Sequence, residues 1–113
     1  MSFLASTTSG DVLLFVFQKS SVLDELSVRQ VSRELNAALD STEEQKVVID
    51  LTPVELMTSS MIGELVKFKK RCDNDGISLA LCGMSPEIKK LFKMTRLDKV
   101  FKIAKSREKA LAS

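Results

Sequence analysis

The sequence predicts a single mixed α/β domain spanning residues 1–113, with a largely parallel β-sheet and about four helices in the order β-β-α-β-α-β-α-β-α. The length of 113 residues suits one domain. The content of 44% hydrophobic and 28% charged residues is typical of a globular protein. Short apolar runs alternate with segments of helical spacing, and this alternation implies right-handed crossovers and a sheet covered by helices.

Short apolar runs predict five strands. Val12–Phe17 is a continuous apolar run, typical of a strand buried on both faces, and the β-branched run 47–51 predicts a central strand. Residues 9–11 predict a tight turn, which pairs the first two strands as a hairpin and makes the sheet mixed. The alternating pattern near the C-terminus is typical of a half-exposed edge strand. The predicted strands are 3–7, 12–17, 47–51, 77–82 and 100–103.

Cap residues and helical spacing predict the helices. Ser27 to Gln30 has the S-x-x-Q form of a capping box, with Leu26 and Val31 at the positions of a hydrophobic staple. The first helix is therefore predicted to begin at Ser27 and to end near Asp40. Three more helices are predicted to begin near Ser59, Ser85 and Ser106. The predicted core-facing residues are Val28, Val31, Leu35 and Leu39, then Met61, Leu65, Phe68 and Cys72, then Ile88, Leu91 and Phe92.

The composition argues against several kinds of chemistry. The chain has no histidine, so it has no histidine-dependent triad and no histidine-ligated metal. Cys72 and Cys82 stand ten residues apart, outside zinc-ligand spacing, and are predicted to be buried, reduced thiols. No pair of carboxylates or lysines is marked out for catalysis. The protein is therefore predicted not to be an enzyme and to need no metal or cofactor.

Charge is unevenly distributed along the chain. Residues 1–66 carry a net charge of −6 and residues 67–113 a net charge of +8. A basic half is compatible with nucleic-acid binding, but there is no Trp or Tyr to stack on bases, so Lys89, Lys90 and Lys93 are interpreted as a solvated helix face. No apolar run is long enough to span a bilayer, and the start lacks the features of a signal peptide. A cytoplasmic protein without nucleic-acid or membrane partners is expected.

A triplet of hydroxyl residues, Thr58, Ser59 and Ser60, stands at the predicted start of the second helix. One hydroxyl is needed as the N-cap, which by itself is an ordinary structural role. The other interpretation is that one hydroxyl accepts a phosphate, because a helix N-terminus carries partial positive charge and unpaired amides. A loop at the carboxyl end of a sheet strand is also where open α/β domains bind ligands.

The residues that follow the triplet also have two interpretations. Ile62 and Val66 lie at the border of the predicted core stripe and either widen the buried face or, with Met61, form a small apolar contact patch for a partner. The first interpretation is preferred. The second is open because methionine adapts readily to a partner surface.

The junction between the central strand and the second helix resembles a known family. Residues 50–63 read D-L-T-P-V-E-L-M-T-S-S-M-I-G, which is similar to the D-L-S-x-V-x-F-M-D-S-S-G-L-G pattern of STAS domains in bacterial anti-sigma-factor antagonists. The resemblance covers roughly residues 10–111 and implies the STAS fold. Thr58 replaces the acidic residue of the pattern, Met61 replaces a glycine, and Ser21 stands where many members have glycine. Further similar residues are Leu23-Asp24, Cys82-Gly83-Met84-Ser85-Pro86, Lys90-Leu91-Phe92 and Met94.

The resemblance implies a regulatory protein-binding function. In that family a serine-kinase anti-sigma factor phosphorylates the serine after the aspartate, which corresponds to Ser59, and the unphosphorylated antagonist binds the anti-sigma factor. A homodimer is also considered. The alternative is a STAS scaffold module of a larger signalling or lipid-transport complex that phosphorylation does not switch. The residues expected to bind the partner are Asp24, Thr58, Ser60, Met61 and Ile62.

Overall fold

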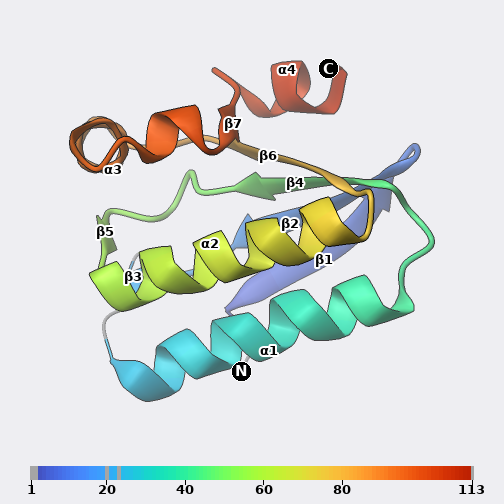
Figure 1. Ribbon diagram of the computed structural model, residues 1–113, viewed down its shortest axis with the longest axis horizontal. Coiled ribbons are helices and arrows are strands. Elements are labelled where there is room, and N and C mark those ends of the chain that lie inside the picture. The colour runs from blue at the N-terminus through green and yellow to red at the C-terminus, as the bar shows by residue number, and fades with distance from the viewer. Residues whose placement is uncertain (1–2, 20, 23, 113) are drawn as a thin grey trace.

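A mixed five-stranded sheet forms the centre of the molecule, as the sequence predicts (Figure 1). The computed structural model describes residues 3–19, 21–22 and 24–112; Leu23, which the family resemblance includes, lies outside the described residues. The elements in chain order are β1 (Leu4–Ser9), β2 (Val12–Phe17), β3 (Ser21–Val22), α1 (Glu25–Ser41), β4 (Lys46–Asp50), β5 (Leu56–Met57), α2 (Ser59–Asn74), β6 (Ser78–Cys82), α3 (Pro86–Met94), the 3-10 turn η1 (Leu97–Lys99), β7 (Lys102–Ile103) and α4 (Arg107–Ala112).

The sheet follows the order β1-β2-β4-β6-β7. Strand β1 pairs with β2 in antiparallel register, from Leu4 opposite Phe17 to Ser9 opposite Val12, and all other neighbours in the sheet are parallel. The turn between β1 and β2 places Gly10 at φ +62°, a backbone conformation that glycine adopts without strain. The predicted hairpin and the predicted edge position of the last strand are confirmed.

Two layers of side chains cover the two faces of the sheet. Residues of α1, α2 and α3 pack on one face in the larger core cluster, and Ala110 of α4 packs on the other. The central strand β4 contributes to both, since Val47 and Ile49 join the larger cluster and Val48 the smaller one. Burial on both faces explains why this strand has a continuous apolar sequence.

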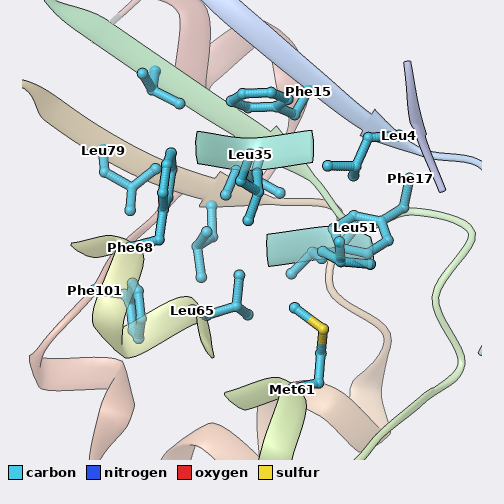
Figure 2. Packing of buried hydrophobic residues seen from close by; sticks show 14 of the residues in the cluster. Leu4, Phe15, Phe17, Leu35, Leu51, Met61, Leu65, Phe68, Leu79 and Phe101 are labelled. Carbon is cyan, nitrogen blue, oxygen red and sulfur yellow. The ribbon is translucent and has the colours of Figure 1, made fainter. Parts of the chain in front are cut away.

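The helix α2 supplies the middle of the larger cluster. Figure 2 shows Met61, Leu65 and Phe68 projecting from α2 into the core. The phenyl ring of Phe68 meets that of Phe15 edge to face, with 6.2 Å between ring centroids. The predicted core stripes of α1 and α2 are confirmed, whereas Leu91 in α3 is only half-buried.

The start of the first helix differs from the prediction. Helix α1 begins at Glu25, and Asp24 is its N-cap: the Asp24 carboxylate accepts hydrogen bonds from the Ser27 amide at 2.8 Å and the Ser27 hydroxyl at 2.9 Å. The predicted capping box at Ser27 is therefore wrong, and Leu26 is exposed rather than part of a staple. Asp24 caps the helix in place of Ser27 because a charged acceptor is favoured at the positive end of a helix.

The structure adds one feature that the sequence pattern misses. Strands β3 and β5 form a separate parallel pair, with Ser21 opposite Leu56 and Val22 opposite Met57. Two residues are too few to show the alternation by which a strand is recognised. At the other edge, β7 contains only Lys102 and Ile103 of the predicted strand 100–103, because the chain before it forms η1.

Candidate functional site

The loop between β4 and α2 ends at a helix start whose N-cap is Thr58. The Thr58 hydroxyl oxygen accepts a hydrogen bond from the Met61 amide at 3.2 Å, and the Thr58 carbonyl accepts one from the Ile62 amide at 3.0 Å. One residue of the hydroxyl triplet therefore meets the capping requirement of α2. The hydroxyls of the other two are not needed for it.

Ser59 and Ser60 occupy the first two positions of α2 and are both exposed. Within the described part of the chain, neither hydroxyl has a hydrogen-bond partner, and the same holds for the two backbone amides. Free amides at the positive end of a helix favour a negatively charged group. The arrangement therefore offers two accessible hydroxyls and a local environment that tolerates a phosphate.

The start of α1 lies at the same end of the molecule as the start of α2 (Figure 1). The β3–β5 pair explains this, because Val22 is opposite Met57 and each helix begins two or three residues further along its chain. Asp24 is exposed, and hydrogen bonds from the Ser27 amide and hydroxyl hold its pKa below the ordinary value. Asp24 and the hydroxyl triplet thus share one end of the molecule, although among the described residues no hydrogen bond joins Asp24 to Ser59.

The structure divides the expected binding residues into accessible and buried ones. Met61 is only 1% exposed and points into the core in Figure 2, which corrects the expectation that its side chain contacts a partner. The helical phase places it in the stripe with Leu65 and Phe68. Ile62 is half-buried and packs against the core cluster, so it widens the buried face while keeping part of its surface exposed.

Two exposed apolar residues at this end are not among those that the sequence predicts to bind a partner. Leu26, in the first turn of α1, and Leu56, in β5 just before the hydroxyl triplet, are large hydrophobic side chains that remain exposed. The sequence pattern predicts a staple contact for Leu26 and no regular element at Leu56. We call Asp24, Leu26, Leu56, Thr58, Ser59, Ser60 and Ile62 together the helix-start surface.

A buried carboxylate anchors the loop that leads to this surface. Asp50, at the end of β4, is 3% exposed at its side chain and accepts hydrogen bonds from the Thr52 amide at 2.9 Å, the Thr52 hydroxyl and the Arg107 guanidinium at 2.8 Å. Burial by itself raises the pKa of Asp50, but the hydrogen bonds from Thr52 and Arg107 outweigh it, and the pKa lies below its ordinary value. Asp50 therefore joins α4 to the loop that follows β4.

Gly83 packs directly against this anchor. Its φ of +73° disfavours other residues, and a Cβ atom added there would lie 2.3 Å from the Thr52 hydroxyl oxygen and 2.4 Å from a carboxylate oxygen of Asp50. The backbone after β6 can approach the anchor this closely because the position is glycine.

The candidate site is an exposed surface and not a cavity. The described residues enclose no pocket and contain no group of three potential metal-ligating side chains. Cys72 and Cys82 are buried free thiols, and burial raises the pKa of each to about 11. The groups that the helix-start surface offers are exposed hydroxyls, one carboxylate and exposed apolar side chains.

The fold and this surface define a class of small α/β domain that presents the starts of two helices at one end of a mixed sheet. The STAS domain model matches residues 4–110, and the chain belongs to the STAS domain family. The family resemblance inferred from residues 50–63 is thereby confirmed.

Relatives with known names agree with this assignment. BtrV of Bordetella bronchiseptica, named as an anti-sigma factor antagonist, is 27% identical over 92 residues, which cover 81% of this chain and 78% of BtrV. The structure of an anti-sigma-factor antagonist (STAS) domain protein from Planctomyces limnophilus has a TM-score of 0.84 and 30% identity, covering 99% of this chain and 97% of that one. SpoIIAA of Bacillus in its phosphorylated form has the same fold, with a TM-score of 0.70, 16% identity and 96% of each chain covered.

Removing one hydroxyl at a time should show that the Thr58 hydroxyl stabilises the fold and that the Ser60 hydroxyl does not. We expect Thr58→Ala to lower the free energy of unfolding by about 1 kcal/mol, because the Met61 amide loses its acceptor. Ser60→Ala, at an exposed position whose hydroxyl makes no hydrogen bond to any described residue, should change the free energy of unfolding by less than about 0.5 kcal/mol. Urea denaturation of both variants measures the difference, and a larger loss for Ser60→Ala would contradict the assignment of the cap.

Proposed function

We propose that this protein is an anti-sigma-factor antagonist that binds an anti-sigma factor through the helix-start surface and is controlled by phosphorylation of Ser59 by that partner, a serine kinase. The observation that carries the proposal is the exposed Ser59 hydroxyl at the start of α2, left free because Thr58 is the cap. We further propose that the protein is cytoplasmic, that residues 1–113 act as one domain and that its role is binding rather than catalysis. Ser59 aligns with the acceptor serine of the family pattern.

The replacement of the family's acidic residue by Thr58 is compatible with this proposal. Aspartate and threonine are both effective N-cap residues, and Thr58 makes the capping hydrogen bond to the Met61 amide. Ser59 consequently keeps its place at the first position of the helix. A kinase that reads the helix start by its shape meets the same hydroxyl in the same position.

A phosphate on Ser59 should leave the fold intact and weaken partner binding. Phosphorylation adds about −1.5 to −2 charges, which the N-terminus of α2 stabilises in the free protein. In a complex the partner covers the phosphate and removes its water, which costs free energy. The exposed apolar side chains of Leu26 and Leu56 at the same end of the molecule offer the phosphate no compensating charge. The structure of phosphorylated SpoIIAA, which has the same fold, supports the proposal that the fold tolerates a phosphate.

The contact residues that we propose are the accessible members of the helix-start surface. Asp24 and Ser60 supply polar groups, and Leu26 and Leu56 supply exposed apolar area. Met61 supports this surface from the core and is not proposed as a contact. A homodimer through the same surface would compete with the partner.

A second candidate function is a STAS scaffold that Ser59 does not switch, within a larger signalling or lipid-transport complex. The observation that favours it is Thr58 in place of the acidic residue, since a kinase that requires a carboxylate next to its acceptor would not modify Ser59. The two candidates differ in whether Ser59 accepts phosphate.

Phosphate incorporation and binding test the proposal together. The chain is incubated with the serine-kinase anti-sigma factor of its own organism and labelled ATP, and the modified residue is located by mass spectrometry. We expect label on Ser59, none in Ser59→Ala, and unchanged labelling in the matched control Ser60→Ala. Ser59→Ala should bind the partner as the wild type does, whereas phosphorylated protein should bind at least tenfold more weakly.

Three outcomes would count against the proposal. Label on Thr58 or Ser60 instead of Ser59 would overturn the register on which it rests. Partner binding without any label would favour the unswitched scaffold. Absence of binding by well-folded wild-type protein would overturn the antagonist function itself.

A further inference from the structure

The solvent-facing side of α3 is basic along its whole length. Ile88 and Phe92 face the core, while Lys89, Lys90 and Lys93 are exposed on the opposite side. The last residue of the helix, Met94, lies beside them and is 73% exposed. The helix thus presents an apolar side chain at the end of a row of ammonium groups.

The segment that follows α3 also exposes basic side chains together with an apolar one. Arg96 is exposed in a left-handed conformation, with φ of 62°, and it precedes η1, whose Lys99 is also exposed. Val100 is 47% exposed, and Lys102 of the edge strand β7 is exposed. We call this set the basic surface; it consists of Lys89, Lys90, Lys93, Met94, Arg96, Lys99, Val100 and Lys102.

The cations of the basic surface are not neutralised within the molecule. Among the described residues none of the six lysine and arginine side chains takes part in an ion pair or a hydrogen bond. Between Pro86 and Ile103 there are six basic residues and only two acidic ones, Glu87 and Asp98, a net charge of +4. The surface belongs to α3, η1 and β7, which contact one another and lie away from α1 (Figure 1). It is therefore available to an anionic partner.

Some acidic side chains elsewhere in the described chain already have cationic partners: Asp40 pairs with Arg71, Glu64 with Lys67, and Asp50 with Arg107. Single-stranded nucleic acid is disfavoured because all six Phe side chains are buried or packed against the core.

We propose that the basic surface binds the surface of a membrane rich in anionic lipid. Lysine and arginine side chains are attracted to anionic headgroups, and exposed apolar side chains among them enter the interface. Met94 and Val100 are exposed apolar side chains in the same basic segment, and the described residues enclose no pocket there. No helix among the described residues could cross a bilayer. Binding at the membrane surface requires no spanning segment. The proposal departs from the expectation, drawn from the sequence, of a protein without a membrane partner.

Vesicle binding of the full chain tests the proposal. The protein is sedimented with vesicles of phosphatidylcholine alone and with vesicles of equal parts phosphatidylglycerol and phosphatidylcholine. We expect binding only to the anionic vesicles and a decrease with added salt. Replacement of Lys89, Lys93 and Lys99 together by glutamine should weaken binding roughly a hundredfold. The matched control replaces Arg33, Lys67 and Lys70 by glutamine, so that net charge is the same, and it should bind as the wild type does.

A further variant distinguishes a membrane from other polyanions. Met94→Ser leaves the charge unchanged and should weaken vesicle binding severalfold, while retention on duplex DNA or polyglutamate should not depend on it. No binding to anionic vesicles, or equal losses in the test and control charge variants, would overturn the proposal. Tighter binding to DNA or polyglutamate than to vesicles, with no effect of Met94→Ser, would also overturn it. Because Ser59 lies outside the basic surface, these results do not depend on the phosphorylation proposal.

Discussion

Replacing Phe68 with alanine should lower the free energy of unfolding by about 3–5 kcal/mol. The side chain is almost fully buried on α2, meets Phe15 edge to face and lies in the middle of the larger core cluster. Its removal loses the transfer free energy of the ring and leaves a cavity that neighbouring strands cannot fill, because the sheet holds them in place. Urea denaturation, with the slope compared between variants, measures the loss.

The adjacent residue provides the matched control. Lys67 is exposed and makes one surface ion pair, with Glu64 at 3.5 Å, so Lys67→Ala should change the free energy of unfolding by less than about 0.5 kcal/mol. Similar denaturation midpoints for the two variants would contradict the orientation of α2 on the sheet. The comparison is informative because the two positions differ by one residue and therefore by 100° around the helix.

Replacing Arg107 with methionine should lower the free energy of unfolding by about 3 kcal/mol at neutral pH. Methionine keeps the apolar stem of the side chain but removes the guanidinium, which leaves Asp50 buried with Thr52 as its remaining partner. Asp50 carries most of the effect, because the Arg107 side chain is 44% exposed and already partly solvated. Loss of this ion pair should also loosen α4, which covers the second face of the sheet.

The pH dependence identifies the charge as the cause. In the wild type the lowered pKa of Asp50 contributes stability above the unfolded-state pKa of about 3.9, and this contribution is lost as the pH falls through the lower folded-state value. In Arg107→Met the cost of burial is no longer fully offset, so the difference between variant and wild type should shrink as the pH falls through the lowered pKa that Asp50 has in the folded wild type, below which the carboxylate is protonated in both proteins. Asp50→Asn combined with Arg107→Met should recover part of the loss at neutral pH. A difference independent of pH, without recovery, would mean that packing of the Arg107 stem is responsible.

Most of the fold could be predicted from local patterns, and the exceptions have physical causes. The strands β2, β4 and β6 are recognisable because burial on both faces requires continuous apolar runs. The start of α1 was predicted incorrectly at Ser27, because two side chains could have capped the same helix and only the folded chain shows that Asp24 accepts from the Ser27 amide. The β3–β5 pair could not be predicted, since its strands have two residues each and their pairing depends on the position of two helices.

The candidate site was predicted in part. The hydroxyl triplet could be found because serine and threonine are preferred at helix N-caps and three hydroxyls are more than one cap needs. Which of the three is the cap could not be decided from the sequence, because all three have a hydroxyl and the helix could begin after any of them. Met61 was predicted both to face the core, from its spacing with Leu65 and Phe68, and to contact a partner, and only the first prediction is confirmed. Leu56 is exposed in β5, which pairs with β3 and not with the main sheet.

The order of the five main strands and the four helices, the buried faces of α1 and α2 and the family follow from the sequence, because they depend on hydrophobic spacing and on the motif at residues 50–63. The short strands β3 and β5 and the ion pair of Asp50 with Arg107, which stands 57 positions further along the chain, emerge only in the folded structure. The same holds for the placement of Asp24 and Ser59 at one end of the molecule. Contacts between distant segments depend on how the sheet orders its strands, and no local pattern of side chains records that order.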